Sequence, residues 1–122
     1  VVLRSNSQLL GSFGLHRDAM RGSEIKARAL GYVLAEEAWG HGYATEAAQR
    51  VLSFAFEEFG LELVSVCHFP FNARSRRVIE KCGFRYEGTI RHAYRRYDNT
   101  VLDSCCYSIM REEYFALKEN AQ

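Results

Sequence analysis

The sequence has 122 residues, of which 48% are hydrophobic and 25% are charged. This length suits one domain, and this composition is typical of a globular protein, which excludes a disordered or fibrous chain. The formal net charge of +1 excludes a general polyanion-binding protein, although a local anion site remains open. No run of about 18 apolar residues is present, so we expect no transmembrane span and no membrane partner.

The four cysteines include one adjacent pair, Cys105 and Cys106, and no C-x-x-C spacing. Such a pattern suits neither a disulfide framework nor a zinc site. The sequence opens without the features of a secretory leader. We therefore expect reduced thiols in a cytoplasmic protein that holds no metal.

Two short apolar segments, residues 1–4 and 9–16, are separated by the polar residues 5–8. This pattern predicts a β-hairpin, because polar turn residues lie between two strand-like runs. A third strand is expected over residues 26–35, where small and β-branched residues run up to a pair of glutamates.

The clearest element is an amphipathic helix over residues 44–59. Its apolar residues are spaced at offsets of 0, 3, 4, 7, 8, 11, 12 and 15: Ala44, Ala47, Ala48, Val51, Leu52, Ala55, Phe56 and Phe59. That spacing places them on one helical face. Gly60 follows directly and is a typical helix stop.

After this helix, an apolar run over residues 61–68 predicts a buried strand, and its position behind a helix favours parallel pairing. A shorter helix is expected over residues 73–82, closed by Gly83. These two elements extend the alternation of strands and helices that begins at residue 26.

Two longer strands are expected over residues 84–97 and 101–110, joined by a hairpin turn at Asp98 and Asn99. A final helical turn is expected over residues 111–118. The order β-β-β-α-β-α-β-β predicts an α/β (α+β) domain with a mixed, mostly antiparallel sheet flanked by helices.

Charge is distributed unevenly along the chain. Between residues 74 and 96, eight basic residues stand against two acidic ones, which gives this stretch a charge of +6. Residues 36–62 carry six acids and one arginine. Two solvated helix faces of opposite sign would explain the pattern. Alternatively, the basic stretch faces a multiply phosphorylated ligand.

The junction before the long helix, residues 38–45, contains Gly40 and Gly42. Glycine lets the backbone approach a ligand closely, and the first helical amides have no intrahelical partner, so the turn suits phosphate. A plain tight turn is the alternative. Because the turn lacks the Gly-Lys-Ser/Thr ending of a P-loop and the third glycine of a dinucleotide motif, ATP hydrolysis and NAD chemistry are disfavoured.

Residues 31–34 and 39–47 together resemble the acetyl-CoA-binding motif of the GCN5-related N-acetyltransferase (GNAT) family. Residues 72–84 and 87–88 are similar to the second half of that family's core. Both motifs are closest to the RimJ/RimL-type branch, which acetylates protein N-termini and small amines. The resemblance covers about residues 26–114.

The resemblance implies the GNAT acyl-CoA acyltransferase fold in a single N-acetyltransferase domain over residues 1–122. In the family, a further strand and one or two helices usually precede the point where this sequence begins, and they form much of the acceptor wall. We therefore expect a domain that lacks these elements or is N-terminally truncated. The natural acceptor amine is not readable from such a sequence.

The resemblance also implies where acetyl-CoA, the co-substrate, would bind. The strand before the turn would diverge from its neighbour, with a backbone N–H near Leu34 polarising the acetyl carbonyl, while the turn holds the pyrophosphate. Asn72 would bind the pantetheine or stabilise the diverging strand, and Ser75 would donate a proton or hydrogen bond to the departing thiolate. The implied acetyl-CoA site consists of Tyr32, Val33, Leu34, Trp39, Gly40, His41, Gly42, Tyr43, Ala44, Thr45, Asn72 and Ser75. Four basic residues of the second motif could contact phosphates of CoA: Arg74, Arg76, Arg77 and Lys81.

The implied reaction is direct attack of a primary amine, from a protein N-terminus or a small molecule, on the thioester. Tyr94 stands where some relatives carry a water-activating glutamate, and it is therefore a candidate catalytic residue beside Ser75. A tyrosine is a poor base at neutral pH but a good hydrogen-bonding group. A strand aromatic that packs its ring is the alternative for Tyr94. Weaker candidates for the base are His68, His92 and Glu36, and Cys67 could act as a nucleophile in a ping-pong route.

Two other classes of function remain open from the sequence. One is a non-catalytic module that holds CoA or a protein on a degenerate acetyltransferase fold. The other is a nucleic-acid-binding domain, suggested by arginines interleaved with Tyr86, Tyr94 and Tyr97 but not our expectation. A homodimer is a further hypothesis, because a partner chain could cover an exposed sheet edge.

Overall fold

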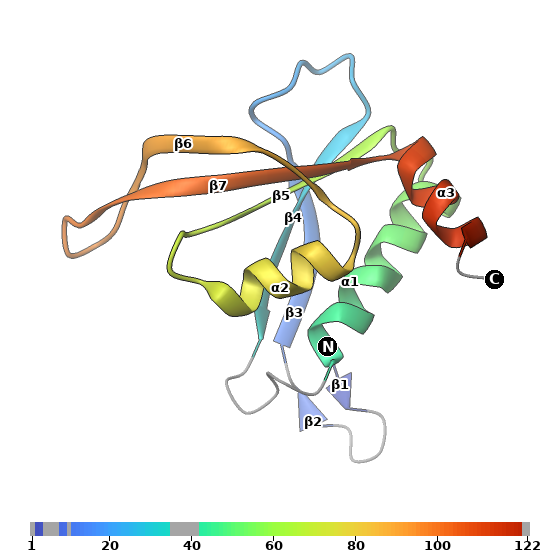
Figure 1. Cartoon of the computed structure of the whole chain (residues 1–122), viewed down its shortest axis with the longest axis horizontal. Coiled ribbons are helices and arrows are strands. Elements are labelled where there is room, and N and C mark those ends of the chain that lie inside the picture. The colour runs from blue at the N-terminus through green and yellow to red at the C-terminus, as the bar shows by residue number, and fades with distance from the viewer. Residues whose placement is uncertain (1, 4–7, 10, 35–41, 121–122) are drawn as a thin grey trace.

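The computed structural model describes residues 2–3, 8–9, 11–34 and 42–120. Its centre is a five-stranded sheet in the order β3-β4-β5-β7-β6 (Figure 1). The strands are β3 (Gly11–Arg17), β4 (Ala27–Leu34), β5 (Leu63–His68), β6 (Arg85–Arg95) and β7 (Val101–Met110). Because β4 and β5 run parallel and the other neighbouring pairs run antiparallel, the predicted fold class is confirmed.

The N-terminal hairpin forms, but its second arm differs from the prediction. Strand β1 (Val2–Leu3) pairs with β2 (Gln8–Leu9) in a separate two-stranded sheet. Strand β3, which the sequence placed in that hairpin, pairs instead with β4 along its whole length. Gln8, which the sequence placed in the turn, lies in β2, and residues 4–7 lie outside the described residues. The partner of β3 depends on contacts more distant in the sequence.

The long helix is α1 (Tyr43–Ser53), which continues into a π-helical turn, η2 (Phe54–Glu58). The prediction of one α-helix to residue 59 is therefore wrong in its last turn. The Phe56 carbonyl in η2 accepts a hydrogen bond from Arg111 Nη1 at 2.7 Å. Gly60 follows with a φ of +68°, a left-handed conformation that favours glycine, so the predicted helix stop is confirmed.

The second helix, α2 (Ala73–Lys81), begins at an N-cap. The Oδ1 atom of Asn72 accepts a hydrogen bond from the Ser75 amide at 3.1 Å, which satisfies one of the first helical amides. Gly83 has a φ of +88° just after the helix ends. The last helix, α3 (Arg111–Asn120), is longer than the helical turn predicted there. In the described part of the chain, no helix is long and apolar enough to cross a membrane.

The β6–β7 hairpin has a wider tip than the two-residue turn that the sequence predicted. Residues 96–100 connect the strands, and the Arg96 amide donates to the Thr100 carbonyl at 2.8 Å. Strand β6 also shifts register against β7 twice, between Tyr86 and Gly88 and between Ile90 and Tyr94. Such irregularities bend a strand and re-aim its side chains.

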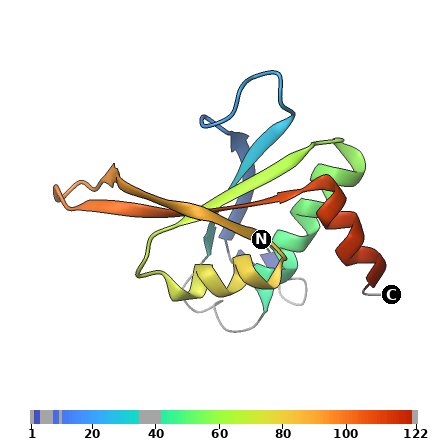
Figure 2. The same cartoon turned by 45° about the horizontal axis from the view of Figure 1, so that its top comes forward.

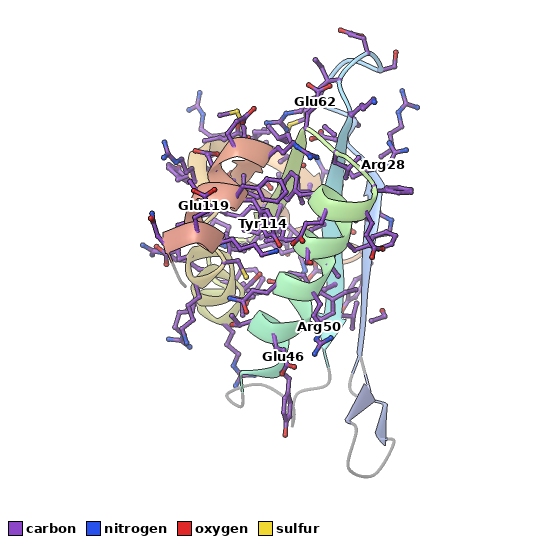
Figure 3. All side chains as sticks on the ribbon, turned by 90° about the vertical axis from the view of Figure 1, so that its right-hand side faces the viewer. Arg28, Glu46, Arg50, Glu62, Tyr114 and Glu119 are labelled. Atoms are coloured by element: carbon purple, nitrogen blue, oxygen red, sulfur yellow. The ribbon has the colours of Figure 1, made fainter. Side chains whose placement is uncertain are left out.

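The hydrophobic core lies between the sheet and the helices α1 and α2 (Figures 1 and 2). Side chains alternate along β5, so Val64 and Val66 enter this core while Ser65 and Cys67 point to the opposite face. Helix α3 adds Tyr114, whose ring stacks on Phe56 at 5.1 Å (Figure 3). The core residues of α1 and η2 include Ala44, Ala48, Leu52, Ala55 and Phe56. The helical periodicity read from the sequence thus identified the buried face up to Phe56, whereas Phe59, which the same spacing assigned to that face, is exposed.

Candidate active site

Strands β4 and β5 diverge after a short paired stretch. Their register begins at Ala27↔Leu63 and ends at Ala29↔Ser65, so only three positions are paired. Beyond them β4 continues along β3, and β5 continues along β7 (Figure 1). The two strands therefore form a fork with its open end toward the beginnings of α1 and α2.

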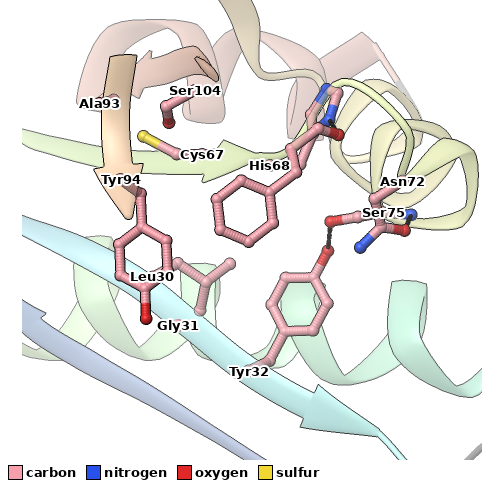
Figure 4. Close-up of a pocket in the computed structure, with 11 residues that line it drawn as sticks. Leu30, Gly31, Tyr32, Cys67, His68, Asn72, Ser75, Ala93, Tyr94 and Ser104 are labelled. Atoms are coloured by element: carbon pink, nitrogen blue, oxygen red, sulfur yellow. Dashed lines mark hydrogen bonds between the residues drawn. The ribbon is translucent and has the colours of Figure 1, made fainter. Parts of the chain in front are cut away.

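A cavity of about 480 Å³ lies at this fork (Figure 4). That volume falls within the usual range of small-molecule sites. Its walls come from the diverging parts of β4 and β5, the segment leading into α2, and the β6–β7 hairpin. The lining residues are Leu30, Gly31, Tyr32, Cys67, His68, Phe69, Asn72, Ser75, Ala93, Tyr94 and Ser104.

The hydroxyls of Tyr32 and Ser75 share a short hydrogen bond inside this cavity (Figure 4). Ser75 is buried, and its backbone amide is held by the cap at Asn72. Burial raises the pKa of Tyr32 above its usual value, and so its hydroxyl keeps its proton at neutral pH. The pair is thus a protonated hydroxyl chain in the cavity wall, suited to donating a proton or a hydrogen bond.

Asn72 lines the cavity, and its Oδ1 atom already caps α2. This cap holds the first turn of α2, which carries Ser75, in place beside the cavity. The structure thus gives Asn72 an indirect part in the site through Ser75. A contact between Asn72 and pantetheine stays a prediction.

Tyr94 reaches the cavity from β6, on the side away from Tyr32 and Ser75 (Figure 4). Its ring lies 5.6 Å from that of Phe69, and 54% of its surface remains exposed. Packing and a role at the cavity mouth are therefore compatible. The catalytic role of Tyr94 stays a prediction.

The histidine candidate His68 is buried and held from both sides. Its Nδ1–H donates to the Phe69 carbonyl at 2.7 Å, which leaves Nε2 to accept from the Tyr107 hydroxyl at 3.3 Å. This arrangement fits a structural histidine better than a base, because both ring nitrogens are engaged by the protein. His92 and Tyr94 both lie on the irregular part of β6, and the His92 amide donates to Asp103 Oδ1 at 3.0 Å.

The remaining cavity thiol, Cys67, is poorly suited to nucleophilic catalysis. Burial and the neighbouring Cys106 thiol raise the pKa of Cys67 to about 11. A thiol in this state is almost entirely protonated at neutral pH, whereas the thiolate is the nucleophile. The structure therefore disfavours the ping-pong route through Cys67.

The glycine turn is described only in its last part. Trp39, Gly40 and His41 lie outside the described residues, as does Glu36. Gly42 has a φ of +79° and immediately precedes α1, and among the described residues a Cβ atom built on it would meet no atom within 4 Å. The positive φ and the open space agree with a backbone that a ligand can approach.

The rest of the predicted CoA site has the following placement. Tyr43, Ala44 and Thr45 form the first turn of α1, where helical amides lack intrahelical acceptors. Val33 and Leu34 lie on β4 beyond the stretch that pairs with β5, and Val33 is 71% exposed. The four basic residues of the second motif all lie on α2 and are exposed, and one of them, Arg76, pairs with Glu80 at 3.3 Å. Their contacts with phosphates stay predictions.

Sequence reasoning missed the partnership of the Tyr32 side chain. The family motif suggested that the backbone around Tyr32 lies beside the thioester, whereas the structure joins its hydroxyl to Ser75, 43 residues away in the sequence. Phe69 was also missed as part of the cavity wall. No local pattern marks either residue, because both act through contacts between distant segments.

The family to which this fold and site belong follows from comparison with known proteins. A family model described as "Acetyltransferase (GNAT) domain" matches residues 1–85. More than half of the sequence is covered, and the chain therefore belongs to the GNAT acetyltransferase family.

Individual relatives agree with this family. The chain is 32% identical over 108 residues to the uncharacterized N-acetyltransferase YoaA of Bacillus subtilis, covering 88% of this chain and 59% of YoaA. It is 34% identical over 112 residues to YdaF of the same organism, provisionally named a ribosomal N-acetyltransferase, covering 89% of this chain and 57% of YdaF. A GNAT-family acetyltransferase of Bacillus anthracis superimposes with a TM-score of 0.81 at 31% identity, over 92% of this chain and 64% of that one. The chain thus spans about three fifths of the length of these relatives.

Proposed function

We propose that this chain is the catalytic core of an acetyl-CoA-dependent N-acetyltransferase, formed as a single domain over residues 1–122. The observation that carries this proposal is the cavity between the diverging β4 and β5, with the Tyr32–Ser75 hydroxyl pair in its wall. Family membership supports acetyl transfer as the reaction. The provisional name of YdaF supports the narrower assignment to the RimJ/RimL-type branch.

The proposed binding mode places the donor along the fork. The pyrophosphate lies at the first turn of α1, next to Gly42, where the helix dipole and exposed amides favour an anion. The pantetheine arm runs along the edge of β4 that has left β5, past Tyr32 and Val33. Its thioester then reaches the cavity, with a backbone N–H near Leu34 directed at the acetyl oxygen.

The chemistry requires a neutral amine, a stabilised oxyanion and a proton for the departing thiolate. Backbone N–H groups in a site that excludes water stabilise an oxyanion strongly. Ser75 supplies the proton or hydrogen bond to the thiolate, and Tyr32 replenishes it through their shared hydrogen bond. Tyr94 positions the acceptor amine or a water molecule beside it by hydrogen bonding. The proton that the amine loses as the amide forms leaves through a chain of water molecules. No metal is required.

The acceptor is a primary amine, and a protein N-terminus demands less of the site than a lysine. An α-amine with a pKa near 8 is about one tenth neutral at pH 7, at a cost of about 1.4 kcal/mol. A lysine with a pKa near 10.4 costs more than about 4 kcal/mol. Because both nitrogens of His68 are already engaged by the protein, we favour an α-amine or a small amine of comparable pKa.

The test is release of free CoA thiol from acetyl-CoA in the presence of a panel of amines. The panel contains N-terminal peptides, small amines and lysine-containing peptides with blocked N-termini. Thiol release that depends on an α-amine supports the proposal. Binding of CoA without release would favour the alternative of a non-catalytic module. The cytoplasmic location and the homodimer stay predictions.

A further inference from the structure

Two thiols that the proposed acetyl transfer does not use face each other across neighbouring strands. Cys67 on β5 and Cys106 on β7 occupy directly opposite register positions, and their Sγ atoms are 3.3 Å apart. Opposite residues of antiparallel strands have Cα atoms about 4.5–5.5 Å apart, which lies within the span that a disulfide bridges. The sulfurs need only approach to about 2.05 Å to bond.

The surroundings of the pair allow an oxidant to reach one thiol first. Cys67 borders the cavity and is exposed there to solvent although neighbouring atoms partly bury its thiol, whereas Cys106 is 4% exposed and does not line the cavity. The adjacent Cys105 points to the other face of β7, where the Thr89 hydroxyl contacts its Sγ at 3.8 Å. Cys82 is buried on the helix side of the sheet, with its Sγ 3.9 Å from the Thr45 carbonyl. Geometry thus selects one pairing among the four cysteines.

We propose that Cys67 and Cys106 are a redox modification site, in which a hydroperoxide converts the two thiols into a cross-strand disulfide at the cavity wall. With hydrogen peroxide as the oxidant, the Cys67 thiolate attacks one peroxide oxygen, the O–O bond breaks and hydroxide departs, which leaves a sulfenic acid on Cys67. The hydroxide takes up the proton that Cys67 released and becomes water. The Cys106 sulfur then attacks the Cys67 sulfur, the S–O bond breaks and a second water leaves. The two thiols lose two electrons and two protons, and hydrogen peroxide is reduced to two molecules of water.

The electrostatic surroundings set the speed of the first step. Burial and then the Cys106 thiol raise the pKa of Cys67 to about 11, and the carboxylate of Asp18 in the β3–β4 loop acts in the same direction. Tyr32 from β4 and Tyr94 from β6 are the tyrosines that line the same cavity. Because only the thiolate reacts, oxidation is slow at pH 7. At pH values below this pKa, the rate increases about tenfold for each unit by which the pH is raised.

The experiment treats the purified chain with hydrogen peroxide at pH 7, 8 and 9 and measures the intact mass and the free thiols over time. We expect a mass loss of two hydrogen atoms, loss of two reactive thiols, and reversal by dithiothreitol. Peptide mapping without reduction should join the segment of Cys67 to the segment that contains Cys106. The rate should rise about tenfold per pH unit.

Two variants identify the partners. The Cys67→Ser variant should form no cross-strand disulfide, whereas the Cys105→Ser variant should form the Cys67–Cys106 disulfide at the wild-type rate. The second variant is essential because Cys105 and Cys106 are adjacent and fall in one proteolytic peptide. Accumulation of sulfinic acid at Cys67 without a cross-link, a bond through Cys105, or a bond between two chains would each overturn the proposal. None of these readouts depends on acetyl transfer.

Discussion

At the scale of single residues, Tyr32 connects the sheet to the reactive end of the proposed site. Its ring stacks on that of Phe13 with centroids 4.8 Å apart and planes 9° from parallel. Its hydroxyl meets Ser75 at the start of α2. The stacked ring fixes the direction of the hydroxyl, so the hydroxyl pair is held in place by packing on one side and a helix cap on the other.

Ser75→Ala and Tyr32→Phe should each lower kcat by at least about tenfold while leaving the Kd for CoA within a few-fold. A group that donates a proton in the transition state contributes typically 10²–10⁴ to the rate, and replacement by solvent recovers part of it. If the two hydroxyls act as one chain, the double variant should be little slower than the slower single variant. Steady-state kinetics and a CoA titration measure both quantities.

Tyr86→Phe is the matched control, because it removes an exposed tyrosine hydroxyl that does not line the cavity. That hydroxyl forms a hydrogen bond of 2.6 Å with the Thr89 hydroxyl. The kcat of this variant should equal that of the unaltered chain. A Ser75→Ala variant with an unchanged rate at saturating acetyl-CoA would remove the acid role from Ser75.

At the scale of elements, the continuous helical segment made of α1 and η2 is flanked by two glycines in the same unusual conformation. Gly42 before this segment and Gly60 after it have φ values of +79° and +68°, and a Cβ atom on either would meet no atom of the part of the chain that the structure describes within 4 Å. Both glycines thus need a positive φ, whereas the proposed phosphate site lies next to Gly42 only. Comparing substitutions at the two positions therefore distinguishes the effect of backbone strain from an effect on ligand binding.

Gly42→Ala and Gly60→Ala should destabilise the fold by a similar amount, about 1–2 kcal/mol, because each forces a side chain into the left-handed region. Only Gly42→Ala should also weaken CoA binding, and Gly42→Val should weaken it further by crowding the pyrophosphate. Thermal unfolding and a CoA titration on the same samples test this. Equal CoA affinity in folded Gly42 and Gly60 variants would contradict the assignment of the turn.

At the scale of the whole molecule, polar contacts join segments that are far apart in the sequence. Arg21 in the β3–β4 loop binds Glu87 on β6 at 2.8 Å and Asp18 at 2.7 Å. The buried Asp18 also accepts from Ser65, the last residue of β5 that pairs with β4. Burial raises the pKa of Asp18, but the hydrogen bonds from Ser65, Arg21 and Met20 together lower it more, so the pKa lies below its usual value. The network therefore secures the sheet at the point where the fork begins.

A second long-range contact joins α3 to η2. Glu57 accepts hydrogen bonds from Lys118, Tyr114 and Ser53, and these lower its pKa from 4.5 to about 2. A carboxylate whose pKa is lower in the folded state stabilises the fold above the unfolded value. The contribution should be complete above pH 4.5 and be lost progressively as the pH falls toward 2.

Glu57→Gln should therefore lower the midpoint temperature of thermal unfolding at pH 7. As the pH is lowered from 4.5 to 2, the midpoint temperature of this variant should decrease less than that of the unaltered chain. Glu58→Gln, on the next residue of the same exposed turn, is the control and should retain the pH dependence of the unaltered chain. Midpoints measured by circular dichroism across this pH range test both. An identical pH profile for the Glu57 variant would show that α3 is held by its apolar contacts instead.

The sequence by itself determined the elements whose signals are local. The apolar spacing of α1, the stop at Gly60 and the shorter helix α2 closed by Gly83 each depend on residues within a turn or two of one another, and each was predicted. The Asn72 cap of α2 was not predicted. The family motifs also pointed to Ser75, which lines the cavity, whereas the role of Gly42 stays a prediction. Local spacing suffices here because a helix hydrogen-bonds to itself.

The tertiary structure decided which distant groups meet. The strand that pairs with β3, the length of the β4–β5 fork, the π-helical turn and the contacts Tyr32–Ser75 and Cys67–Cys106 were not evident from any local pattern. Each depends on the register between strands or on packing against a remote segment. A shift of one residue in that register would turn every side chain of a strand to the other face, so these pairs are fixed only when the whole sheet forms.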